Sequence, residues 1–112
     1  MSADRPSLDQ PSLSPETQKR IDLLFAPDLR HEAATWLASE CGRNLPLAKD
    51  ASDAAIERIQ IAALKVSGGD LDGLVRAIEL AQRDWRDLLV AAGFAEDIHA
   101  HETWLPGDEV RS

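Results

Sequence analysis

The sequence has little of what a disulfide-bonded, membrane-spanning or β-rich protein requires. A single cysteine, Cys41, excludes an intramolecular disulfide and fits a reducing compartment. Tyrosine is absent, and aromatic residues make up 4% of the 112 residues. No apolar run approaches the ~18 residues of a membrane span, and the first ten residues lack the apolar stretch of a secretory signal. These absences predict a cytoplasmic protein without a membrane segment.

Basic side chains are also scarce. Twelve Lys and Arg stand against twenty Asp and Glu, which gives a net charge of −8. Binding to a phosphate backbone depends on clustered Lys and Arg, so the balance argues against nucleic acid as a partner. What is abundant is alanine and leucine, within a hydrophobic fraction of 44%. Because both are strong helix formers, the composition predicts a single all-α domain.

The strongest helical pattern runs from Leu71 to Ala92. Apolar residues recur at helical spacing along one side, and charged residues occupy the other. Asp70 suits the N-cap and Gly93 the left-handed position after the helix, so Phe94 would follow in a Schellman stop. A break at Asp84, which would then cap a second helix, is the alternative. The stripe keeps its phase across that position, so we expect one continuous helix.

Shorter helices are expected on either side of this long helix. The patterns predict helices over 14–25, 28–41 and 52–66, and a short one that ends near 104. The expected fold is therefore a single compact bundle of four to five helices, with a long central helix near 71–92. Its domain would span residues 14–105, between a disordered N-terminal arm at 1–13 and a polar tail at 106–112.

The chemistry-bearing residues form no recognisable catalytic motif. His99 and His101 resemble a metal-binding pair, but on a helix their rings would point about 200° apart. Cys41 could act as a nucleophile if His31 served as its base, but the two residues would lie about 15 Å apart along one helix. We therefore expect no catalytic residues, no metal and no cofactor. The alternative is a small metal-binding protein or metal-dependent enzyme that uses His31, Cys41, His99 and His101.

The acidic charge is concentrated near the C-terminus. Residues 95–112 hold five acidic side chains against Arg111 alone, a net of −4 and thus half of the total. Such a field steers a protein toward a basic partner. The sequence therefore favours a non-catalytic protein–protein interaction module, such as a bacterial regulatory, accessory or immunity-type protein. The predicted partner-binding residues are Glu96, Asp97, Glu102, Trp104, Leu105, Asp108 and Glu109, with Trp104 as the apolar anchor. Homo-oligomerisation is a further option if Ile61, Leu64, Leu80 and Val90 form an exposed patch.

Overall fold

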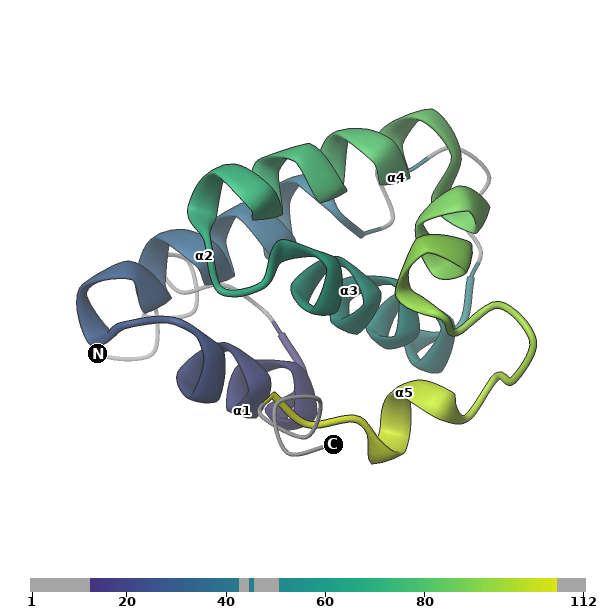
Figure 1. Ribbon diagram of the computed structural model, residues 1–112, viewed down its shortest axis with the longest axis horizontal. Coiled ribbons are helices and arrows are strands. Elements are labelled where there is room, and N and C mark those ends of the chain that lie inside the picture. Colours follow the sequence, from purple (N-terminus) through teal and green to yellow (C-terminus); the bar gives the residue numbers. More distant parts are fainter. Residues whose placement is uncertain (1–12, 43–44, 46–50, 107–112) are drawn as a thin grey trace, which may run out of the picture.

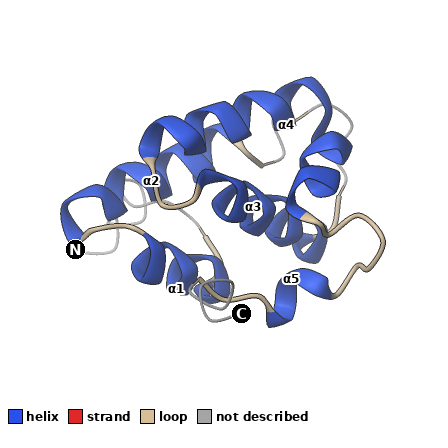
Figure 2. Cartoon of the chain, in the orientation of Figure 1, coloured by secondary structure: helices blue, strands red, loops and turns tan. Residues whose placement is uncertain are grey.

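The computed structural model describes residues 13–42, Leu45 and residues 51–106. This part of the chain is an all-α bundle, as predicted, and contains no strand (Figures 1 and 2). The helices are α1 (Pro15–Leu24), α2 (Pro27–Glu40), α3 (Asp53–Ser67), α4 (Leu71–Ala92) and α5 (Ala100–Thr103). The long helix at 71–92 is confirmed with the predicted bounds. The predicted disordered arm at 1–13 and polar tail at 106–112 lie almost entirely outside the described residues, so both stay predictions.

The helix ends follow from local side-chain chemistry. Ser14, Ser52 and Asp70 each accept a hydrogen bond from the backbone N–H three residues later, at 3.2, 3.1 and 2.9 Å. At the other end of α4, Gly93 takes the left-handed conformation with φ of 80°. The Phe94 N–H then donates to the Leu89 carbonyl at 2.9 Å. The expected Schellman stop is therefore confirmed, and it turns the chain sharply into the C-terminal segment.

The expectation of an unbroken long helix is wrong at Asp84. This residue has extended backbone angles, φ −165° and ψ 102°, inside the α4 span. Its carboxylate Oδ1 accepts a hydrogen bond from the Arg86 N–H at 3.0 Å, so it begins the second half of the helix as a local cap. The kink separates the two halves of α4 visibly at the upper right of Figure 1. An aspartate side chain can hydrogen-bond to a nearby backbone N–H and so compete with the helical hydrogen bonds. The apolar residues on both sides of the bend still pack into the core.

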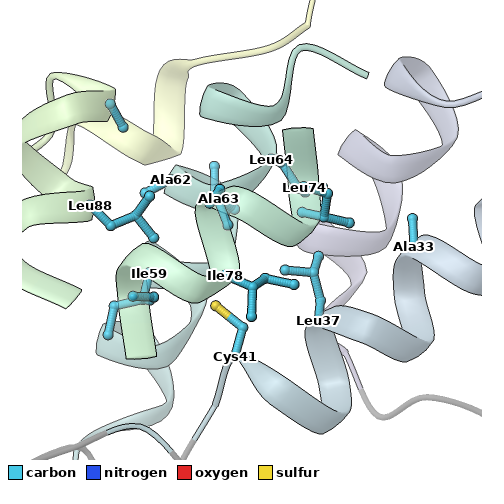
Figure 3. Packing of buried hydrophobic residues seen from close by; sticks show 14 of the residues in the cluster. Ala33, Leu37, Cys41, Ile59, Ala62, Ala63, Leu64, Leu74, Ile78 and Leu88 are labelled. Atoms are coloured by element: carbon cyan, nitrogen blue, oxygen red, sulfur yellow. The ribbon is translucent and has the colours of Figure 1, made fainter. Parts of the chain in front are cut away.

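The core is formed mainly where α3 packs on α4 (Figure 3). The α2 helix contacts α4 and α1, and α3 also contacts α1 and α5. Four successive residues of α3, from Ile61 to Leu64, are 0% exposed, which shows that the helix is enclosed on several sides. The apolar patch considered for self-association therefore does not form, because Ile61 and Leu64 are core residues. Val90 alone of that set is strongly exposed, at 65%.

Cys41 belongs to this core rather than to a reactive site. Its side chain is 0% exposed, and burial raises the pKa of the thiol to about 12. The thiolate is the nucleophilic form of cysteine, so this residue is held in its unreactive state.

Among the described residues, no helix combines the length and apolar character that a membrane span requires.

Candidate partner-binding surface

The predicted binding residues lie mostly on one strip of chain, which we call the acidic segment: residues 95–104, between the end of α4 and the end of α5. Glu96, Asp97 and Glu102 are all exposed on it. Trp104 and Leu105 are only half-exposed. Asp108 and Glu109 lie outside the described residues, so their part in the surface stays a prediction. The structure thus places three predicted carboxylates on a single short segment.

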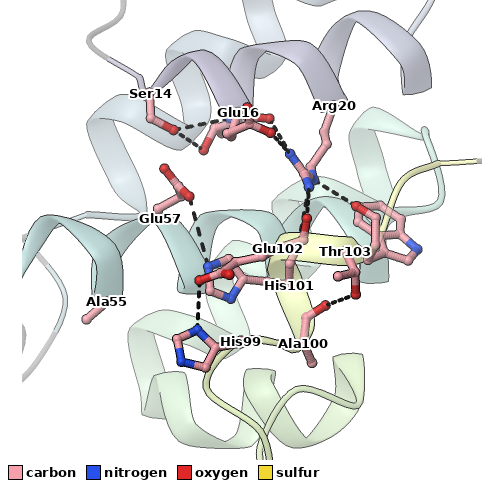
Figure 4. Close-up of polar contacts among 12 residues, drawn as sticks. Ser14, Glu16, Arg20, Ala55, Glu57, His99, Ala100, His101, Glu102 and Thr103 are labelled. Carbon is pink, nitrogen blue, oxygen red and sulfur yellow. Dashed lines mark hydrogen bonds and ion pairs between the residues drawn. The ribbon is translucent and has the colours of Figure 1, made fainter.

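A buried arginine anchors the C-terminal end of the acidic segment. Arg20, on α1, is 1% exposed. Its guanidinium donates to the carbonyl oxygens of His101 and Glu102, each at 3.2 Å, and of Trp104 at 3.0 Å. It also donates to the backbone and side chain of Glu16 at 2.8 and 3.0 Å. Figure 4 shows this side chain reaching from α1 to α5. The carbonyls that end a helix carry partial negative charge, so a cation is well placed there.

A second arginine holds the start of the segment. Arg58, on α3, donates through its Nη2 to the carbonyl oxygens of Phe94 and Ala95. The Phe94 ring is 2% exposed, and the Lys65 ammonium lies 5.0 Å from its centroid. The acidic segment is therefore fixed to the bundle at both ends, by α3 and by α1. It presents its carboxylates on a rigid support.

His101 faces inward from this segment. It is 3% exposed, and its ring meets Phe94 edge to face at 6.3 Å. Its Nε2 lies 4.0 Å from the Glu57 carboxylate, beyond hydrogen-bond distance, and its Nδ1 has no hydrogen-bond partner. Burial lowers the pKa of the imidazole, an effect that outweighs the opposing charges of Glu102 and Glu57. The side chain is thus a neutral part of the packing.

His99 behaves in the opposite way at the surface. Its Nδ1 lies 2.9 Å from the Glu102 carboxylate, and this hydrogen bond raises the pKa of the imidazole and lowers that of the carboxyl (Figure 4). The backbone N–H of His99 donates to Asp97 Oδ1 at 2.8 Å. Two of the three carboxylates therefore also shape the segment. Glu96 has no such local role.

Ile98 is a large exposed apolar side chain of the segment, which the sequence reasoning missed. It is 63% exposed and lies between Asp97 and His99. The predicted anchor, Trp104, is half-buried against the core, and its indole Nε1 is buried without a hydrogen-bond partner. An isoleucine inside the polar run AEDIHAHE was the signal available from the sequence. Arg20 and Arg58 carried no comparable signal.

Beside Ile98 lies a pocket of about 210 Å³. It is formed by the first turns of α3 and by the acidic segment, and is lined by Ser52, Ala54, Ala55, Arg58, Ile98, His99, His101 and Glu102. Its alanine and isoleucine side chains offer an apolar surface, while the His99–Glu102 pair closes one side. The arrangement suits contact with an amphipathic side chain from a partner. It contains no nucleophile paired with a base.

The residues of the metal-binding alternative are widely different in environment. His31 is exposed on α2, whereas Cys41 and His101 are buried. Within the described part of the chain, no three His, Cys, Asp or Glu residues are grouped so as to hold a metal ion.

A comparison of the chain with protein-family models, curated proteins and solved structures found no match.

Proposed function

We propose that this protein is a non-catalytic interaction module that binds a basic protein partner through the acidic segment. Its role would be that of a regulatory, accessory or immunity-type protein, acting in the cytoplasm. A single cysteine, which can form no intramolecular disulfide, suits that compartment.

The observation that carries the proposal is the position of Ile98. This side chain is 63% exposed on a segment whose other exposed side chains include the carboxylates of Glu96, Asp97 and Glu102. An apolar contact surrounded by charges of one sign is typical of a binding site whose centre excludes water and whose rim selects the partner. Isolated exposed isoleucines are common. The acidic residues around Ile98, on a segment anchored at both ends, are therefore what supports a binding site here.

The rigidity of the segment supports the same proposal. Arg20 and Arg58 together make five hydrogen bonds to its backbone and to that of Phe94. A surface that is already ordered loses little conformational entropy on binding. The anchoring would be hard to explain for a segment that served only as a connection.

The test is a pull-down from the native host with two matched variants. Glu96→Arg combined with Asp97→Asn removes the net negative charge of the segment and keeps the side-chain oxygen that caps His99. Asp28→Asn combined with Glu32→Arg, at exposed positions of α2, makes the same net-charge change elsewhere. We expect a basic protein to be recovered with wild type and with the α2 variant but not with the segment variant.

Recovery of the same proteins by all three chains would contradict the proposal. Equal loss in both variants would also contradict it, because it would mean that net charge and not this surface determines binding. Once the partner is known, Ile98→Ser should speed its dissociation, whereas neutralising Glu96 should mainly slow association.

A further inference from the structure

A second surface lies at the other end of α3. It is a groove of about 380 Å³ between the end of α3 and the first half of α4. We call it the arginine groove, and its lining residues are Val66, Ser67, Asp70, Gly73, Arg76, Ala77, Leu80 and Arg83. Val66 is 38% exposed and Leu80 is half-exposed, so part of this lining is accessible apolar surface.

The charge of the groove is opposite to that of the molecule. Arg76 and Arg83 are both exposed, two helical turns apart on α4 and so about 10 Å along its axis. Neither forms an ion pair or hydrogen bond within the described part of the chain, although Asp72 and Glu79 stand at helical spacing from them. The acidic residue of the lining, Asp70, is engaged as the α4 cap. Two guanidinium groups are thus available beside an apolar floor.

Ile98 does not line the arginine groove of its own molecule. The segment packs near the start of α3, where Ala55 and Ile98 line the same pocket, and Val66 is at the other end of that helix. Val66 lies eleven positions after Ala55 on α3, a distance of about 17 Å. In Figure 1 the end of α3 lies at the left, and α5 lies below its start at the right. Ile98 and the apolar part of the groove at Val66 are therefore separated along α3.

We propose that the arginine groove binds the acidic segment of a second copy of this chain. Ile98 of one copy would enter the groove between Val66 and Leu80, while Glu96 and Asp97 pair with Arg76 and Arg83. The proposal rests on the proposed function, because it uses the same acidic segment and names a basic surface that fits it. The segment and the groove match in apolar character and in charge. The segment has an exposed apolar side chain and carboxylates, and the groove has an apolar floor and exposed guanidinium groups.

The contact would be heterologous, since a different surface is used on each side. A head-to-tail contact leaves one groove and one segment free at the two ends, so it continues into chains of molecules or closes into a ring. Two copies of net charge −8 also repel each other, which makes the contact weak. Self-association should therefore be detectable only at high protein concentration. Exchanging the charges of the groove and the segment between two variants can separate their local attraction from the overall repulsion.

The experiment is sedimentation of the full chain over a range of concentrations. The groove variant carries Arg76→Glu and Arg83→Glu, and the segment variant carries Glu96→Arg and Asp97→Asn. We expect the mean mass of wild type to rise with concentration and each variant alone to stay monomeric. An equimolar mixture of the two variants should associate again, because the acidic groove of one then meets the arginine introduced at position 96 of the other. The α2 variant, Asp28→Asn with Glu32→Arg, should behave as wild type.

Melting curves of each variant establish that the bundle is intact, since all the changed side chains are exposed. Ile98→Ser, which leaves every charge in place, should also reduce the association of wild type. A wild type that stays monomeric at every concentration would overturn the proposal, as would a mixture that fails to associate. Neither result would touch the proposed function, whose test is loss of a basic partner from the segment variant.

Discussion

The Nε of Arg20 lies 3.0 Å from the carbonyl oxygen of Trp104, a residue 84 positions further along the chain. The same guanidinium reaches the carbonyls of His101 and Glu102. One side chain of α1 therefore holds the end of α5, and with it the candidate binding surface. All its donors are directed to acceptors, which makes burial of the charge tolerable.

Replacing Arg20 by methionine should destabilise the protein by about 3 kcal/mol, since three carbonyls would lose a charged donor. The loss should begin locally, because the segment can detach while the rest of the core persists. Urea denaturation measures the total effect, and amide hydrogen exchange shows whether residues 99–104 lose protection first.

Lys19→Met is the matched control, because Lys19 is the exposed neighbour of Arg20 on α1. It should change stability by no more than a few tenths of a kcal/mol. Arg20→Lys should recover only part of the loss, since an ammonium group lacks the planar fork that reaches several carbonyls at once. Equal stability of the Arg20→Met and Lys19→Met variants would mean that the hydrogen bonds of Arg20 to the end of α5 contribute nothing to stability.

Asp84 should act as a cap and not as an interior helix residue. Its Oδ1 accepts from the Arg86 N–H and from the Arg86 Nε, each at 3.0 Å. Asp84→Ala should therefore cost about 0.5–2 kcal/mol, the range for loss of a helix cap. Thermal unfolding of the two proteins provides the measurement.

Asp84→Ser keeps a capping oxygen and should recover most of that stability. A gain in stability for Asp84→Ala would indicate that the two halves of α4 join into one straight helix when the aspartate is removed. Aspartate is a poor interior helix residue, so the sign of the change separates the two structures.

The helices could be predicted because their information is local. Ser14, Asp70 and Gly93 mark their helix ends through short-range hydrogen bonds and backbone angles, which depend only on neighbours in the sequence. The stripe along residues 71–92 likewise needs no knowledge of the partner helices. The apolar stripe continues in phase on both sides of Asp84, so the sequence favours a continuous helix there over a break. The break is caused by the hydrogen bond between the Asp84 carboxylate and the Arg86 N–H, and hydrophobic periodicity does not detect such a cap.

The candidate surface was only half predictable. Glu96, Asp97 and Glu102 follow from the charge distribution, and all three are exposed. The burial of Arg20 could not be predicted, since three of its acceptors come from a segment more than eighty residues away. Trp104 and Ile98 show the same limit: a large aromatic residue is half-buried, while a smaller apolar neighbour is exposed. Which side chain faces the core depends on how Arg20 and Arg58 orient the segment.

His101 should make the protein less stable in mild acid. Burial lowers the pKa of its imidazole below the ordinary value of 6.5, so near that pH the unfolded chain binds more protons than the folded one. Stability from the neutral imidazole is therefore fully present above the unfolded pKa and is lost as the pH falls through the folded pKa. His101→Phe, which keeps a ring against Phe94 and removes the unpartnered Nδ1, should flatten this loss. Denaturant midpoints measured across the acidic range provide the test.

His99 is the internal control for that experiment, because its shift has the opposite sign. The bond to Glu102 raises the pKa of His99, so its stabilisation is present below the unfolded pKa and is lost as the pH rises through the folded pKa. His99→Gln should remove this contribution and steepen the net fall of stability on acidification. A profile that His101→Phe leaves unchanged would show that another group dominates the acid response.

Gly73 tests how closely α4 must approach the end of α3. On its own helix, Gly73→Ala should stabilise by about 1 kcal/mol, the difference in helix propensity. A Cβ at this position would, however, lie 2.6 Å from the carbonyl oxygen of Ser67, a backbone atom that cannot rotate away. Separating the two helices enough to admit the methyl costs about 1–3 kcal/mol in a packed core, so we expect a net loss. Glu79→Ala, at an exposed position of the same helix, should leave the melting temperature nearly unchanged. A higher melting temperature for Gly73→Ala would mean that the turn between α3 and α4 relaxes freely.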